Sequence, residues 1–123
     1  MGNYSYFVDQ VGCELDISKL NERAKLFLED YEIEPKDIES LGDTFDGWKI
    51  QGYWYDNFIN FLYDCARAMK NLTEDKSDNY IEMNEEQGYK FIIHFLLEEG
   101  KPKIILGYAP MEWKEEELKE KGD

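Results

Sequence analysis

The sequence predicts an α+β domain in which two helices pack on one face of an antiparallel sheet of about four to five strands. Two segments have the apolar spacing of amphipathic helices, and several others alternate like strands. A length of 123 residues suits one domain with one core, which we expect over residues 1–112. A charged tail should follow over 113–123, as a frayed helix or a disordered segment, since Leu118 is its single large apolar residue after Trp113.

Both predicted helices are indicated by apolar residues that recur with helical spacing. The first begins after Asp16 or Ser18, either of which can cap it, and ends near Tyr31. The second begins at Asp56 or Asn57. Its apolar stripe comprises Phe58, Leu62, Cys65, Ala66, Met69 and Leu72. Between the two, Pro35 fits the first turn of a short helix that would run through Leu41.

Five further segments predict strands, because apolar and polar residues alternate along them or because they form short apolar runs. These segments are residues 4–8, 48–53, 80–84, 89–97 and 103–108. The connections 85–88 and 98–102 are short and contain glycine, which is typical of antiparallel hairpins. The last three strands should therefore form a meander at the C-terminal end of the domain.

Charge is the most unusual property of the chain. Its 28 acidic and 14 basic residues give a net charge of −14. Half of this excess falls within residues 29–46, where eight acids face only Lys36. The eight acids are Glu29, Asp30, Glu32, Glu34, Asp37, Glu39, Asp43 and Asp46. Those at the end of the first helix oppose its dipole, and an arrangement that works against local stability favours a binding surface.

The charge also selects a class of partner. Nucleic acid and anionic lipid are bound mainly through Lys and Arg, so we expect neither as a direct partner. A basic protein is the complementary partner, and Trp54 or Tyr55 could anchor it. No stretch reaches the roughly 20 apolar residues of a membrane span, and residues 1–6 lack the pattern of a signal peptide. Cysteines outside any CxxC pair suit free thiols in the reducing cytoplasm.

Residues suited to catalysis are scarce. His94 is the single histidine, and its place between Ile93 and Phe95 predicts a neutral ring packed or hydrogen-bonded within the sheet. Cys65 lies on the apolar stripe of the second helix, where a core thiol is expected. The chain contains neither a calcium-binding loop pattern nor a phosphate-binding glycine loop. We therefore expect no enzyme, no metal and no cofactor.

In composition the chain is similar to acidic inhibitors encoded by phages and other mobile elements. The leading hypothesis is an inhibitor of the anti-CRISPR or anti-restriction type, which mimics part of the DNA backbone and occupies a basic nucleic-acid-binding surface on another protein. Its contacts would come from the eight acids of residues 29–46 and from Trp54 and Tyr55. Three alternatives stay open. They are an immunity protein that neutralises a toxin nuclease, a small enzyme or ligand-binding domain that uses His94 or Cys65, and a domain whose charge serves solubility alone.

Overall fold

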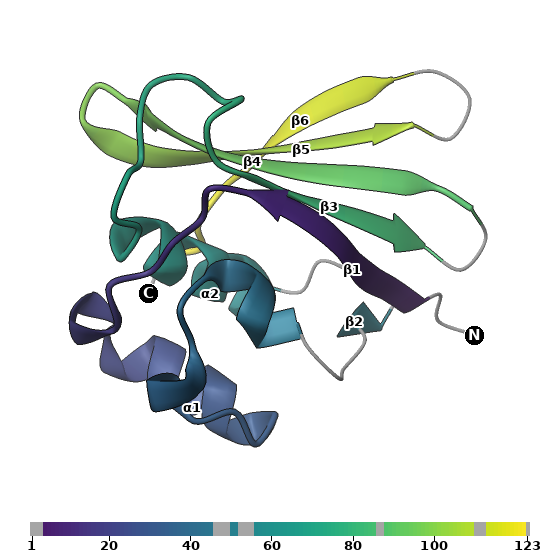
Figure 1. Cartoon of the computed structure of the whole chain (residues 1–123). Helices are drawn as coiled ribbons and strands as arrows, with labels where there is room; N and C mark the ends of the chain where they lie inside the picture. Colours follow the sequence, from purple (N-terminus) through teal and green to yellow (C-terminus); the bar gives the residue numbers. More distant parts are fainter. Residues whose placement is uncertain (1–3, 46–49, 52–55, 86–87, 110–112, 123) are drawn as a thin grey trace.

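The helices and the sheet form layers, with both helices on one face of the sheet (Figure 1). The computed structural model describes residues 4–45, 50–51, 56–85, 88–109 and 113–122. Its strands are β1 (Tyr4–Val11), β2 (Ile50–Gln51), β3 (Tyr80–Glu85), β4 (Lys90–Glu98), β5 (Lys101–Ala109) and β6 (Lys114–Leu118). They pair antiparallel in the order β2-β1-β3-β4-β5-β6. The helices are α1 (Glu22–Asp30) and α2 (Asp56–Arg67), with 3-10 turns η1 (Ile17–Lys19), η2 (Pro35–Asp37) and η3 (Leu41–Phe45). The predicted α+β fold is confirmed.

The meander of β3, β4 and β5 is also confirmed. Ile81 pairs with Ile93, which pairs in turn with Leu106 on β5. All three side chains are buried against the helical layer, together with Phe95 and Ile104. Because strand residues alternate between faces, the positions between them lie on the outer face of the sheet. The alternation in the sequence thus sets the register of the meander.

The second predicted helix forms, but it ends earlier than its apolar stripe suggests. α2 ends at Arg67, whereas helical spacing continues in the sequence to Leu72. The backbone after α2 pairs instead with the segment after β1: Asp16 N donates to Ala68 O at 2.8 Å, and Lys70 N donates to Glu14 O at 2.9 Å. A tertiary pairing therefore replaces the last turn of the helix.

The first predicted helix is divided in two. Asp16 caps the 3-10 turn η1, as its side chain accepts from Ser18 N. Leu20 is then extended and buried, and Asn21 caps α1 by accepting from Ala24 N at 2.9 Å. The short helix expected from Pro35 is similarly divided into η2 and η3. Gly42, which follows the predicted end of that helix at Leu41, lies buried within η3.

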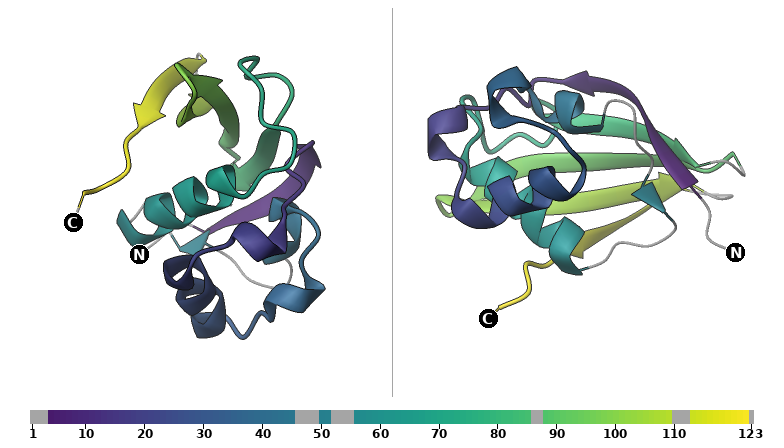
Figure 2. Two further views of the ribbon diagram at one scale, coloured as in Figure 1. Left: turned by 90° about the vertical axis from the view of Figure 1, so that its left-hand side faces the viewer. Right: turned by 90° about the horizontal axis from the view of Figure 1, so that it is seen from below.

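The C-terminal tail differs from the expected frayed helix or disordered segment, because residues 114–118 form β6 at the edge of the sheet. Leu118 pairs with Ile104 and is only 7% exposed, so the large apolar residue of the charged run faces the core. The Tyr63 hydroxyl on α2 donates to Leu118 O. The chain after β6 then turns toward α2 (Figure 2).

Charged side chains join this C-terminal segment to the helices. Asp64 on α2 has no exposed side-chain surface and accepts from Arg23 Nε at 2.8 Å and from Arg23 Nη2 at 2.7 Å. Arg23 and Arg67 both bind Glu120, which follows β6. Hydrogen bonds from Arg67 and Arg23 lower the pKa of Glu120, so its carboxylate remains ionised. The network connects α1, α2 and the C-terminal segment.

Candidate functional site

The structure brings five of the sequence-predicted acidic residues onto one surface, which we call the acidic face. Its residues are Glu32, Glu34, Asp37, Glu39 and Asp43. Two adjoining grooves form this surface, and Asp43 lines both of them. All five residues are exposed, so their carboxylates are accessible to a partner.

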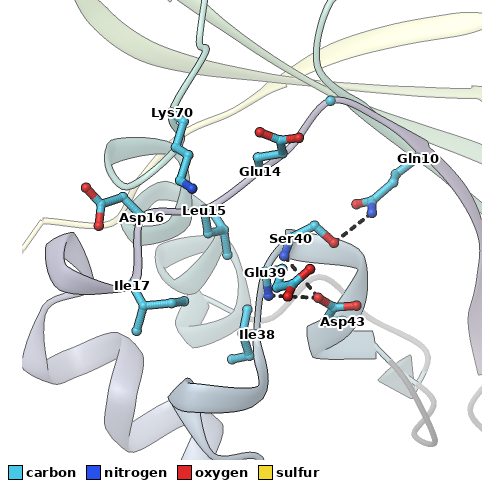
Figure 3. Close-up of a pocket in the computed structure, with 11 residues that line it drawn as sticks. Gln10, Glu14, Leu15, Asp16, Ile17, Ile38, Glu39, Ser40, Asp43 and Lys70 are labelled. Atoms are coloured by element: carbon cyan, nitrogen blue, oxygen red, sulfur yellow. Dashed lines mark hydrogen bonds between the residues drawn. The ribbon is translucent and has the colours of Figure 1, made fainter.

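The larger groove has a volume of about 700 Å³ and lies between the segment after β1 and the segment that leads into η3 (Figure 3). Its acidic side chains are Glu14, Asp16, Glu39 and Asp43. Among the described residues that line it, Lys70 is the basic one. A hydrogen bond from the Ser18 hydroxyl lowers the pKa of Asp16, and the charges of Lys19 and Lys70 act in the same direction. Asp16 is therefore anionic at neutral pH.

Side-chain hydrogen bonds hold this groove in shape. Asp43 Oδ2 accepts from Glu39 N at 2.8 Å and from Ser40 N at 3.0 Å, as the dashed lines in Figure 3 show. Gln10 on β1 donates to Ser40 Oγ at 2.7 Å and accepts from Gly42 N at 2.9 Å. A Cβ on Gly42 would lie 2.8 Å from Gln10 Oε1, so glycine is needed for this close approach. The Gln10 side chain thus fixes the acidic turn on the sheet.

The smaller groove has a volume of about 610 Å³ and continues the acidic face toward the end of α1. It is lined by Glu32, Ile33, Glu34, Lys36, Asp37 and Asp43. Lys36 Nζ lies 3.0 Å from Glu34 Oε2, but the two side chains are 77% and 65% exposed. Solvent screens such an exposed ion pair, which contributes little to stability. A cation from a partner can therefore replace Lys36 at small cost.

Glu32 occupies a position that does not favour a glutamate. α1 ends in a Schellman motif, in which Glu32 N donates to Glu29 O and Ile33 N donates to Leu28 O, both at 3.0 Å. The motif holds Glu32 at a φ of 59°, in the left-handed region that glycine normally fills. Its charge also lies at the negative end of the helix dipole, and the last turn of α1 contains no basic residue. A residue that opposes two local preferences favours a role in binding.

Replacing Glu32 by glycine is expected to stabilise the protein by about 1 kcal/mol, because glycine adopts this φ without the steric cost of a side chain. The melting temperature in differential scanning calorimetry should rise by roughly 3–6 °C. Glu34→Gly is the matched control, since it removes the same charge at an ordinary φ of −87° and should bring no gain. A lower melting temperature for Glu32→Gly would mean that the Glu32 side chain stabilises the fold. That result would contradict the inference that this residue serves binding at a cost in stability.

Other sequence-predicted residues do not join the acidic face. Glu29 and Asp30 are exposed on the last turn of α1, but neither lines the two grooves of the acidic face. Asp30 lines a separate groove between α1 and α2. Asp46, Trp54 and Tyr55 lie outside the described residues, so the predictions for them remain predictions.

Sequence reasoning missed several residues that line these grooves, among them Glu14, Asp16 and Leu26. Glu14 and Asp16 carried no local signal as site residues, because the pairing of Leu15 with Met69 is what brings their segment to the larger groove. Leu26 lines the groove between α1 and α2 and is 55% exposed. For Leu26 a signal existed, since it falls outside the helical spacing of the other apolar residues in this segment, which are Leu20, Ala24, Phe27, Leu28 and Tyr31.

The histidine and the two cysteines are buried. His94 Nδ1 lies 2.9 Å from Lys76 O, and because a carbonyl oxygen only accepts, Nδ1 carries the proton. Burial raises the pKa of Cys13 to about 12 and that of Cys65 well above its ordinary value. Both thiols therefore stay protonated at neutral pH, which leaves them poor nucleophiles. Within the described ranges, no three His, Cys, Asp or Glu side chains are placed to hold a metal ion.

Comparisons with known proteins assign the chain to no family. No family model, no curated protein and no solved structure gives a significant match. In the part of the chain that the structure describes, no helix is long and apolar enough to cross a membrane. The acidic face thus defines the candidate site by its own geometry and charge. It is an exposed anionic surface with two adjoining grooves, and its carboxylates can pair with Arg and Lys side chains.

Proposed function

We propose that this protein is an acidic cytoplasmic inhibitor. It would bind a basic, nucleic-acid-binding surface of another protein and partly mimic the DNA backbone. The observation that carries this proposal is the acidic face. Its five exposed carboxylates line two adjoining grooves, and Lys36 is their one ion-pair partner within the described residues. A surface built to contact phosphates offers Arg and Lys side chains, which pair equally well with carboxylates.

The partner class follows from the same chemistry. Anionic grooves attract a cationic surface over a distance and speed the encounter, while charge-assisted hydrogen bonds form on contact. CRISPR effectors and restriction enzymes hold nucleic acid in such basic channels. An anti-CRISPR or anti-restriction inhibitor encoded by a phage or another mobile element would use this surface directly. The position of Glu32 supports binding over solubility alone, since a merely solvating charge has no need of a strained site.

A capture experiment with charge reversals tests the proposal. The protein is immobilised and exposed to extracts of cells that carry CRISPR and restriction systems, and the partner's affinity is then measured by calorimetry. Glu34→Lys with Asp37→Lys should weaken binding roughly 100-fold, as expected for the loss of close charge pairs at an interface. Binding should also fall steeply between about 0.1 M and about 1 M salt, because the screening length falls from about 10 Å to about 3 Å.

The matched control places the same charge change elsewhere. Glu99→Lys with Glu116→Lys raises the net charge equally, but Glu99 lies in the β4–β5 turn and Glu116 on β6, at the edge of the sheet farthest from β2. This variant should keep most of the affinity. Equal losses in both double variants would show that net charge alone matters, which contradicts a role for the acidic face. Capture of a toxin nuclease encoded beside the gene would instead identify an immunity protein.

A further inference from the structure

A second concave surface lies outside the acidic face, between α1 and α2. It has a volume of about 190 Å³, and its lining includes Leu26, Phe27, Asp30, Asn57 and Phe61. Pockets for drug-sized molecules measure about 300–1,000 Å³, so this groove is too small for such a ligand. Its size suits one long side chain of a partner protein.

The walls of the groove are apolar and partly aromatic. Phe27 stacks on Phe61 with 4.3 Å between ring centroids and 17° between ring planes. Phe61 is buried, while Phe27 is half-buried and Leu26 is 55% exposed. The wall therefore offers apolar surface to the aliphatic part of a side chain. Tyr31 also packs against Phe27, with 5.2 Å between ring centroids and 47° between ring planes. The remaining surface of the half-buried Phe27 ring is where a planar cation can pack.

The polar groups of the groove favour a cation. Asp30 carries a carboxylate at the negative end of the α1 dipole, and no described residue forms an ion pair or a hydrogen bond with its side chain. The side chain of Asn57 likewise has no hydrogen bond to a described residue. Arg23 also lines the groove, but Asp64 and Glu120 already bind its guanidinium. The charge that remains available to a partner is the negative charge of Asp30.

We propose that this groove receives a single arginine side chain from the protein's basic partner. The inference rests on the proposed function and adds an anchor site on α1. The arginine stem would lie along Leu26, and its guanidinium would stack on Phe27 while it donates two hydrogen bonds to Asp30. Arginine suits the groove better than lysine, because only its planar head can stack and donate as a fork at once.

The groove can be tested without the partner. Arginine amide is titrated into the ¹⁵N-labelled protein, with citrulline amide as a probe of nearly the same shape and the same α-amino group but with an uncharged side chain. Arginine amide should cause saturable NMR shifts at the amides of Leu26, Phe27, Asp30 and Asn57. Citrulline amide should bind roughly tenfold more weakly, and Asp30→Asn should weaken arginine amide by a similar factor, because both changes remove a charge-assisted contact.

Glu29→Gln is the matched control, since it removes a neighbouring charge on α1 that does not line the groove. It should leave the affinity for arginine amide within about twofold, because it touches no contact of the probe. Absent shifts, shifts confined to the acidic face, equal binding of both probes, or an unchanged affinity in Asp30→Asn would each overturn the inference. If a captured partner binds Asp30→Asn normally but is lost on reversal of Glu34 and Asp37, the groove fails while the proposed function stands.

Discussion

A chain truncated after residue 112 is expected to lose about 4 kcal/mol or more of its free energy of unfolding. Truncation removes β6, and with it the buried Leu118 that faces Ile104. Loss of one buried leucine side chain alone costs about 2–5 kcal/mol. The hydrogen bond from Tyr63 to Leu118 and the ion pairs of Glu120 are lost as well, and each such bond contributes about 1 kcal/mol.

Urea denaturation measures this loss. Removing only residues 122–123 is the control, because Leu118 and Glu120 remain, and stability should not change. Leu118→Ala keeps the full chain and should cost about 2–4 kcal/mol, which tests the same contact if the truncated chain does not fold. A truncated chain as stable as the full one would mean that β6 does not contribute to the free energy of unfolding. Residues 113–123 would then behave as the frayed or disordered tail that the sequence predicts.

Replacing Asp64 by asparagine is expected to cost about 3 kcal/mol, the second large effect. Asp64 is the central acceptor of its network: its carboxylate receives two hydrogen bonds from Arg23 and one from Asn21 at 2.8 Å. Arg67 Nη1 lies a further 3.3 Å from the same carboxylate. The side chain of Asp64 is fully buried, whereas those of Arg23 and Arg67 are 40% and 45% exposed, so water screens these interactions only from the arginine side. Loss of the charge would leave the arginines without the buried carboxylate that they bind. Asparagine can also accept from fewer of these donors.

The measurement is again urea denaturation at neutral pH, with Asp30→Asn as the matched control. Asp30 is exposed at the end of α1, so its neutralisation should leave stability unchanged or slightly increased. NMR should show the loss of Asp64 as broadening or shifts at α1 and at residues 119–122, which the network joins. A change below about 1 kcal/mol would indicate that Glu120 alone satisfies both arginines.

Local patterns explain why much of the fold could be predicted. The meander follows from alternation in β3, β4 and β5, and α2 follows from a stripe that places Phe58, Leu62 and Cys65 in the core. Periodicity of this kind depends on neighbours in sequence, and each segment must bury its apolar side whatever the topology. The fold class therefore needs little tertiary information.

Elements that depend on distant partners were predicted less well. The sequence analysis did not predict β6, because one leucine in a run of charged residues gives almost no periodic signal. The segment forms a strand because it pairs with β5. The break between η1 and α1 was missed because Leu20 is extended where it is buried, which a helical pattern does not reveal. α2 ends early because residues 68–70 pair with the segment after β1.

The candidate site shows the same division. The sequence by itself determined that the protein is an acidic α+β domain with its negative charge concentrated in residues 29–46, since composition and periodicity need no folded structure. Only the tertiary structure decided that Glu32, Glu34 and Asp37 share a groove with Asp43, while Asp30 lies in another. The physical reason is that long-range packing brings these side chains together. Here Gln10 attaches η3 to β1, and the local spacing of residues in the sequence does not predict that contact.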